Sequence, residues 1–330
     1  MNKPINNLLK TIGNTPLVRL NKLCNDFNCE VYAKLESFNP SMSVKDRIVN
    51  YIIEKAEKEG ILKPGMTIVD ATSGNTGLSI ALIALIKNYK CILTVKDNSA
   101  KAKIQQLQLY GARVIKCPAK AKPEDPLSYY SMAKKIVKQT PNAFFLDQNF
   151  NNNHFKAHYN STGKELWNQT DGKISHFFTS ASTGGTVSGT GAFLKKKNPN
   201  IKIICADGKG SVLKPFHEEG IYYKELKKQT PLEGVGKDII PSVFHADIID
   251  ECIEVNNEKS IKNALEVLKN EGIFAGGSSG AAIDAFKQYR KKYPEEKISM
   301  AVLNFPDHGL KYMGKLYTLE SEAENAADLF

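Results

Sequence analysis

The chain has 330 residues, of which 42% are hydrophobic and 24% charged, the balance of a globular protein long enough for two domains. This composition excludes a mainly disordered chain, and the longest apolar run, residues 78–86, is far shorter than the roughly 20 residues that span a bilayer. Lys and Arg outnumber Asp and Glu by 45 to 35, but the lysines are spread over helix-like segments, so no nucleic-acid partner is expected.

Neither a membrane partner nor a targeting segment is expected, because the first ten residues lack a long apolar run, and the expected location is the cytoplasm. The six cysteines form no CxxC pair, so the sequence predicts free, mostly buried thiols and no metal site. His217, His245 and His308 are scattered along the chain and are expected to be surface or packing residues rather than ligands.

Short apolar segments alternate with segments of helical length from residue 31 onward. Residues 31–36, 67–72 and 91–95 read as strands, and they are separated by the helix-like segments 47–60 and 77–88. This alternation is typical of α/β proteins with parallel sheets.

A second alternating series follows an Asn-rich, loop-like stretch at residues 147–153. Its strand-like and helix-like runs are, in chain order, 174–181, 186–200, 201–208, 259–272 and 298–307. We therefore expect an α/β fold of two three-layer domains with mostly parallel sheets. The expected boundaries are 1–148 for the N-terminal domain, 149–318 for the C-terminal domain and 319–330 for a tail, with the first roughly 35 residues free to pack on the other domain.

Three loops rich in Gly, Ser and Thr, at residues 72–77, 182–186 and 276–280, each adjoin a helix-like run. Such loops direct backbone N–H groups toward an anion at a helix N-terminus, and glycine allows the backbone to approach a ligand closely. Each loop alone is better explained by helix capping, because Ser, Thr and Gly are ordinary capping residues. The dinucleotide pattern G-x-G-x-x-G is absent from all three loops.

Lys45 lies in the stretch NPSMSVKDR, after a predicted strand and at the start of a predicted helix. The positive end of the helix dipole favours a neutral amine there, which is the form that attacks an aldehyde. An exposed lysine at a helix start is the simpler alternative, and this stretch alone does not exclude it.

Seven motifs occur in an order that resembles the fold-type II pyridoxal 5′-phosphate (PLP) enzymes of the cysteine synthase and cystathionine β-synthase family. They are NTPLV (14–18), SVKDR (43–47), TSGNTG (72–77), LDQ (146–148), STGGT (182–186), EGVGKDIIP (233–241) and GGSSG (276–280). The resemblance extends over about residues 7–317. It implies a fold like that of the tryptophan synthase β subunit, PLP as cofactor and a homodimer.

The resemblance also implies a role for each matching residue. Lys45 is expected to bind PLP as a Schiff base and to remove the substrate α-proton, Asn75 to contact the 3′-hydroxyl, and Ser278 to contact the pyridine nitrogen. The loop that binds the cofactor phosphate is expected to comprise Ser182, Thr183, Gly184, Gly185 and Thr186. The substrate carboxylate is expected to contact Thr72, Ser73, Gly74, Thr76 and Gln148.

A neutral hydroxyl at the pyridine nitrogen makes the ring a weaker electron sink than a carboxylate does, which favours β-elimination over transamination. The implied reaction is β-replacement on serine, an activated serine or cysteine through an aminoacrylate intermediate, giving cystathionine, cysteine or a related thioether. The stretches 128–136, 208–211, 233–241 and 306–317 favour the cystathionine β-synthase type. No haem is expected, because the resemblance covers only the catalytic core.

Three alternatives remain open. They are an O-acetylserine-dependent cysteine synthase, an amine-accepting synthase with a diaminopropionate-type product, and a PLP-binding protein whose activity has faded and that binds a partner.

Three features depart from the family pattern and leave substrate preference and lid behaviour open. Ser182 stands where glycine is usual, residues 96–104 replace a Met-Pro stretch, and Asn149 replaces a tyrosine.

Overall fold

The computed structural model describes residues 4–23, 27, 29–72, 74–122 and 125–317. Its framework is a six-stranded sheet of order β1-β2-β10-β7-β8-β9 and a four-stranded sheet of order β5-β4-β3-β6. All paired strands run parallel except β1 and β2, which are antiparallel. The predicted α/β class with mostly parallel sheets is confirmed.

The four-stranded sheet is built from one continuous stretch of the chain. Its strands are β3 (Thr67–Ala71), β4 (Lys90–Lys96), β5 (Arg113–Cys117) and β6 (Ala143–Phe145). The helices that pack on it or beside it are α1 (Lys45–Lys58), α2 (Asn75–Ile86), α3 (Lys101–Leu109) and α4 (Tyr129–Gln139).

The six-stranded sheet combines strands from both ends of the chain. Its strands are β1 (Leu17–Arg19), β2 (Glu30–Leu35), β7 (His176–Ser180), β8 (Lys202–Gly208), β9 (Glu251–Val255) and β10 (Met300–Phe305). The later helices are α5 (Asn153–Asn160), α6 (Thr162–Gln169), α7 (Gly185–Lys197), α8 (Leu213–Glu219), α9 (Asn257–Glu271) and α10 (Gly277–Lys292). Short 3-10 helices occur at Leu8–Thr11, Glu36–Phe38, Ala246–Ile248 and Gly309–Tyr312.

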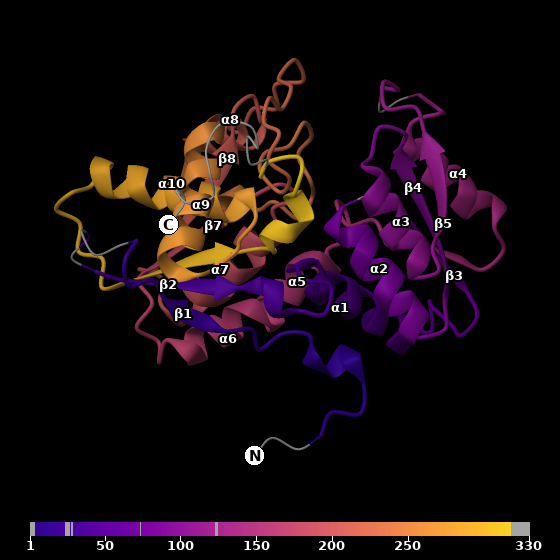
Figure 1. Ribbon diagram of the computed structural model, residues 1–330, viewed down its shortest axis with the longest axis horizontal. Coiled ribbons are helices and arrows are strands. Elements are labelled where there is room, and N and C mark those ends of the chain that lie inside the picture. The colour runs from indigo at the N-terminus through magenta and orange to yellow at the C-terminus, as the bar shows by residue number, and fades with distance from the viewer. Residues whose placement is uncertain (1–3, 24–26, 28, 73, 123–124, 318–330) are drawn as a thin grey trace, which may run out of the picture.

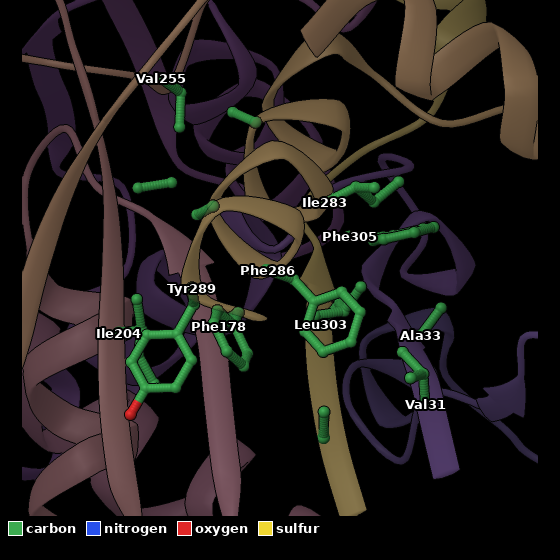
Figure 2. Packing of buried hydrophobic residues seen from close by; sticks show 14 of the residues in the cluster. Val31, Ala33, Phe178, Ile204, Val255, Ile283, Phe286, Tyr289, Leu303 and Phe305 are labelled. Atoms are coloured by element: carbon green, nitrogen blue, oxygen red, sulfur yellow. The ribbon is translucent and has the colours of Figure 1, made fainter. Parts of the chain in front are cut away.

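Successive buried residues of a strand point to opposite faces of the six-stranded sheet. Phe178 and Leu303 belong to the core on the α10 side, whereas their neighbours Phe177 and Val302 belong to the core on the opposite side. Figure 2 shows the first of these cores, in which the Phe178 and Phe286 rings have centroids 5.4 Å apart. A central strand buried on both faces therefore reads as a continuous apolar run, as the sequence does here.

The four-stranded sheet is covered in the same way. Ile68 belongs to a core shared with α1 and α2, and the adjacent Val69 to a smaller core shared with α4. Helix α2 buries all residues from Thr76 to Ala84, which explains why its sequence is apolar on every side. Both sheets thus form the middle of three layers.

Helices α1 and α5 lie between the two sheets in Figure 1, and α5 packs against both α1 and α7. Strands β1 and β2 precede α1 in the chain but pair within the six-stranded sheet. The boundary between residues 148 and 149 stays a prediction, and the predicted tail, 319–330, lies outside the described residues.

Two further observations concern the described residues alone. None of their helices combines the length and the apolar composition that crossing a membrane requires. The five cysteines among them are free thiols, and four of these are buried; Cys24 lies outside the described residues.

Candidate active site

The carboxyl end of β10 is the point where the predicted motifs meet. The bridge between Ser43 and Asp307, together with a 2.8 Å hydrogen bond from the Val44 N–H to the Pro306 carbonyl, holds the start of α1 against this end. The Gly276 N–H donates to the Asp307 carbonyl at 3.1 Å, which brings the start of α10 to the same place. Loops after the carboxyl ends of parallel strands commonly form ligand sites in α/β folds.

Lys45 is the first residue of α1 and is partly buried. Burial lowers the pKa of its amine to about 8, against the opposing charge of Asp307. Burial is a cause of this shift that the local sequence does not indicate. A larger fraction of neutral amine is present near pH 7 than in an ordinary lysine, which is the form that attacks a carbonyl carbon.

Asn75 begins α2, and both ends of its amide group are held. Its Nδ2 donates to Asp307 Oδ2 at 2.6 Å, and its Oδ1 accepts from Lys311 Nζ at 2.8 Å. The Tyr312 hydroxyl also donates to Asp307 Oδ2, and Lys311 Nζ donates to the Ser41 carbonyl at 2.7 Å. The amide is thus fixed in one orientation.

Asp307, Lys311 and Tyr312 are further residues of this site that the sequence motifs did not indicate. They lie within the stretch 306–317, which in the sequence indicates only the type within the family. The sequence signal for Asp307 is its position at the end of the predicted strand 298–307, since the carboxyl end of a strand faces the ligand side of a parallel sheet.

We expect Lys311→Met to raise the Kd for PLP by roughly tenfold or more, the effect of losing a hydrogen bond to a charged group. Without the ammonium group the Asn75 carbonyl loses its donor and the amide is free to turn. Titration of the apoprotein with PLP, followed by visible absorbance, measures the change. Lys311→Arg should retain most of the affinity, and the exposed Lys262→Met on α9 serves as the control. An unchanged Kd for Lys311→Met would show that Lys311 does not fix Asn75.

The predicted phosphate loop leads directly into α7. The N–H groups of Ser182, Thr183 and Gly184 donate to no other residue that the structure describes, so they are available to an anion at the helix N-terminus. Gly184 has a φ of +86°, and a Cβ atom there would lie 2.6 Å from the Phe244 ring. Ser182 is not among the residues with positive φ, so this departure from the family pattern causes no backbone strain.

Two buried histidines of α5, His154 and His158, pack against this loop. His158 Nε2 lies 3.2 Å from the Thr186 hydroxyl, and a Cβ atom at Gly185 would collide with the His154 ring. His154 Nδ1 lies 2.9 Å from the Gln148 carbonyl, which only accepts, so Nδ1 carries the proton. Burial, and then the charges of Lys45 and Lys237, lower the pKa of His154 to about 3, so the ring is neutral.

The predicted substrate loop brings Thr76 and Gln148 together. The Thr76 hydroxyl donates to Gln148 Oε1 at 2.6 Å, and the Gly74 N–H donates to the Thr72 hydroxyl at 3.4 Å. Ser73, predicted as a further substrate contact, lies outside the described residues. The Thr72 hydroxyl and the Gln148 side-chain NH2 group donate to no other residue that the structure describes, so both are available to a carboxylate.

Ser278 lies in the first turn of α10, which begins at Gly277. The predicted loop 276–280 is therefore mostly helical, and its backbone N–H groups point out of the helix start. A Cβ atom at Gly234 would lie 3.8 Å from Ser278 Oγ, so the segment 233–241 passes over this hydroxyl. The hydroxyl has no hydrogen bond to another described residue, which leaves it free for a ligand.

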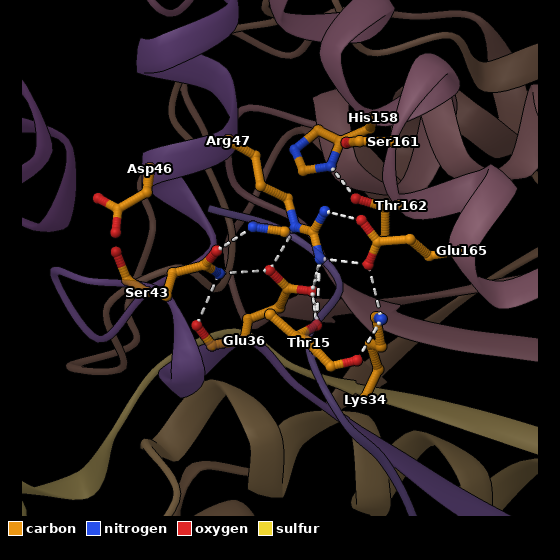
Figure 3. Close-up of polar contacts among 12 residues, drawn as sticks. Thr15, Lys34, Glu36, Ser43, Asp46, Arg47, His158, Ser161, Thr162 and Glu165 are labelled. Carbon is orange, nitrogen blue, oxygen red and sulfur yellow. Dashed lines mark hydrogen bonds and ion pairs between the residues drawn. The ribbon is translucent and has the colours of Figure 1, made fainter. Parts of the chain in front are cut away.

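A buried ion network anchors the start of α1 (Figure 3). Arg47 Nε lies 2.6 Å from Glu36 Oε2, Arg47 Nη1 lies 2.6 Å from Glu165 Oε1, and Lys34 Nζ lies 2.8 Å from Glu165 Oε2. Burial alone raises the pKa of Glu165, but hydrogen bonds and charges from Arg47 and Lys34 lower it to about 2. The network joins β2, α1 and α6 two residues from Lys45 and so fixes the position of that lysine.

Comparison with known proteins decides which family has this arrangement. The model of the family described as pyridoxal-phosphate dependent enzyme matches residues 8–305. The chain belongs to this family. The predicted family, enzyme class and cofactor are thereby confirmed.

Several relatives are similar over nearly the whole of this chain. Cystathionine beta-synthase of Apis mellifera is 41% identical over 93% of this chain and 60% of its own length, and that of Mus musculus is 38% identical over 95% and 55%. This chain thus spans a little over half the length of these relatives. Cysteine synthase of Staphylococcus aureus is 37% identical over 96% of this chain and 99% of its own length.

Two solved structures have the same fold. A hydrogen sulfide-producing enzyme from Fusobacterium nucleatum superposes with a TM-score of 0.86 at 32% identity, covering 95% of this chain and 99% of that one. O-ureido-L-serine synthase superposes with a TM-score of 0.88 at 26% identity, covering 99% of both chains.

The site described above suits the PLP of this family. The unpaired N–H groups at the start of α7 suit its phosphate, and the narrow space at Gly184 admits only backbone beside it. The Lys45 amine, whose pKa is lowered to about 8, suits its aldehyde, and the free hydroxyl of Ser278 suits its ring nitrogen. The predicted residues thus lie together and offer the donors that PLP needs.

Proposed function

We propose that this enzyme catalyses β-replacement, in which a thiol replaces the β-substituent of serine, an activated serine or cysteine. The products are cystathionine, cysteine or a related thioether. The observation that supports this most directly is the free Ser278 hydroxyl at the start of α10, at a position where a carboxylate would favour transamination. Asp307, a carboxylate of the described site, is held by Asn75 and Tyr312.

The roles of the residues follow from their positions. PLP, when bound, withdraws electrons from the substrate Cα and so makes its proton more acidic. Lys45 takes that proton, the bond from Cβ to its substituent breaks with its electron pair, and the thiolate sulfur bonds to Cβ before Lys45 returns the proton to Cα. The low pKa of Lys45 suits a base that works near neutral pH.

The remaining residues bind and orient. The loop from Ser182 to Thr186 holds the cofactor phosphate, and Asn75, fixed by Asp307 and Lys311, holds the cofactor ring through its 3′-oxygen. The residues that bind the substrate carboxylate are Thr72, Ser73, Gly74, Thr76 and Gln148. Their donors fix Cα close to Lys45, which is the main requirement for rapid proton transfer.

Three alternatives differ in substrate or in activity. An O-acetylserine-dependent cysteine synthase is supported by the Staphylococcus aureus relative, which matches this chain over 99% of its length. An acceptor other than a thiol, such as an amine, is the second alternative, since the same site geometry serves any nucleophile. A PLP-binding protein with faded activity is disfavoured because Lys45, Asn75 and Ser278 are all present.

Absorbance spectroscopy of the PLP-loaded protein tests the function. We expect a visible band that changes on addition of one of serine, O-acetylserine, O-phosphoserine or cysteine, because only an accepted donor changes the bound cofactor. Homocysteine or hydrosulfide added with that donor should then yield a product that mass spectrometry identifies. A protein that gains no visible band after incubation with PLP is not this enzyme.

We further propose a homodimer in the cytoplasm. Large apolar side chains at the surface support self-association, since Leu109 is 85% and Phe38 is 64% exposed in the single chain. Free thiols are typical of a reducing compartment. Light scattering of the purified protein measures its mass directly, and a monomeric mass contradicts the dimer.

A further inference from the structure

Lys237 lies within electrostatic reach of three other lysines, which come from two parts of the fold. Lys96 ends β4 of the four-stranded sheet, and its ammonium lies over the Tyr129 ring at 5.5 Å from the centroid. Lys228 and Lys237 come from the segment after β8 of the other sheet, and both Lys45 and Lys96 act electrostatically on Lys237. The site therefore carries positive charge that no role proposed above uses.

The backbone around Lys237 is fixed against the phosphate loop. The Gly236 N–H donates to the Ala181 carbonyl at 2.7 Å, one residue before that loop begins. The Lys237 N–H donates to the Ser211 hydroxyl at 3.0 Å, and its carbonyl accepts from Val212 at 3.0 Å. The position of this lysine is thus set by the site itself rather than by a surface loop.

The ammonium group of Lys237 has no hydrogen bond or ion pair with any residue that the structure describes. Lys228 Nζ donates only to the Leu232 carbonyl, at 3.1 Å. Of the nearby carboxylates, Glu233 is already paired with Lys103 at 2.6 Å and with Lys315 at 3.1 Å.

The remaining nearby carboxylates are Asp207, which accepts from the Gly208 and Lys214 backbone N–H groups, and Asp238, which lies on the exposed side. Asp238 Oδ1 accepts from the Lys228 backbone N–H at 2.5 Å. Burial first, and then the charges of Lys228 and Lys45, lower the pKa of Lys237 to about 8, which is the cost of holding it there without an anion. Unpaired cations in a partly buried site bind an anion strongly, because the anion replaces lost hydration.

We infer that Lys237, together with Lys228 and Lys96, binds an anionic substituent of a substrate, distinct from the α-carboxylate beside Thr76 and Gln148. The inference rests on the proposed β-replacement and names its substrate class. Two sources supply such an anion. It is either the phosphoryl leaving group of the donor amino acid or a carboxylate carried by the acceptor thiol.

Paired substrates separate these sources in the PLP-loaded enzyme. The donor arm compares O-phosphoserine with O-acetylserine at a fixed hydrosulfide concentration. The acceptor arm compares mercaptoacetate with 2-mercaptoethanol at a fixed concentration of the better donor. Lys237→Gln is expected to raise KM for the anionic member of one pair by at least roughly tenfold more than for its uncharged partner, with kcat less affected. Lys237→Arg should restore most of the loss.

Lys269→Gln on α9 is the matched control, because it removes the same charge from an exposed lysine with no ion pair in the described part of the chain. Equal KM changes within both pairs overturn the inference. A higher Kd for PLP in Lys237→Gln, with no selective change in KM, instead assigns this lysine to the cofactor phosphate and also overturns it.

A binding measurement keeps the inference separate from the proposed function. Calorimetric titration of the PLP-loaded protein with inorganic phosphate should show binding that weakens at least roughly tenfold in Lys237→Gln and persists in Lys269→Gln. Such binding without any turnover upholds the anion position and rejects β-replacement. Turnover without phosphate binding and without selective KM changes upholds β-replacement and rejects the anion position.

Discussion

Lys45→Ala is expected to lower kcat/KM for β-replacement by about a thousandfold or more, since a positioned general base alone contributes factors of that order. Lys45 is the partly buried amine at the start of α1, with a pKa lowered to about 8. Without it, the start of α1 offers no amine to take the α-proton. Steady-state kinetics with the donor identified by absorbance measures the loss.

Lys58→Ala provides the control, because Lys58 is an exposed residue at the other end of the same helix. It should keep wild-type rates, and Lys45→Ala should keep the wild-type thermal unfolding midpoint. Borohydride reduction of the PLP-loaded wild type, followed by peptide mass spectrometry, should locate the cofactor on Lys45. Retention of more than a tenth of the rate by Lys45→Ala removes this lysine from the mechanism.

Arg47→Leu is expected to lower the free energy of unfolding by about 3–5 kcal/mol, the usual effect of breaking a buried ion pair by removing one partner. Arg47 is 3% exposed and Glu36 is fully buried, so the substitution leaves the Glu36 carboxylate charged without its cation. Glu165 keeps Lys34 at 2.8 Å and is affected less. Urea unfolding followed by tryptophan fluorescence measures the change.

Arg19→Leu is the control for this experiment. Arg19 and Glu30 form an ion pair at 3.7 Å with side chains 56% and 44% exposed, and such surface pairs contribute about 0–1 kcal/mol. Replacing Arg47 and Glu36 together by apolar residues should recover part of the loss, because no buried charge is then left unpaired. A loss no larger than that of Arg19→Leu would show that the network is not held away from water.

The sequence by itself determined the local elements and, through the order of its motifs, the family. The segments predicted at 67–72 and 77–88 correspond to β3 (Thr67–Ala71) and α2 (Asn75–Ile86), with small shifts at their ends. Apolar periodicity sets these elements because side chains repeat on a face every two or 3.6 residues. Lys45 and the glycine-rich loops were recognisable because each motif is short and continuous in the chain.

The tertiary structure alone decided which distant residues complete the site. Asn75 meets Asp307 across 232 residues, and Lys311 meets Ser41 across 270. These contacts depend on the register of β2 beside β10, which places the start of α1 against the end of the last strand. Local patterns carry no information on such register, because it is fixed by the packing of whole sheets.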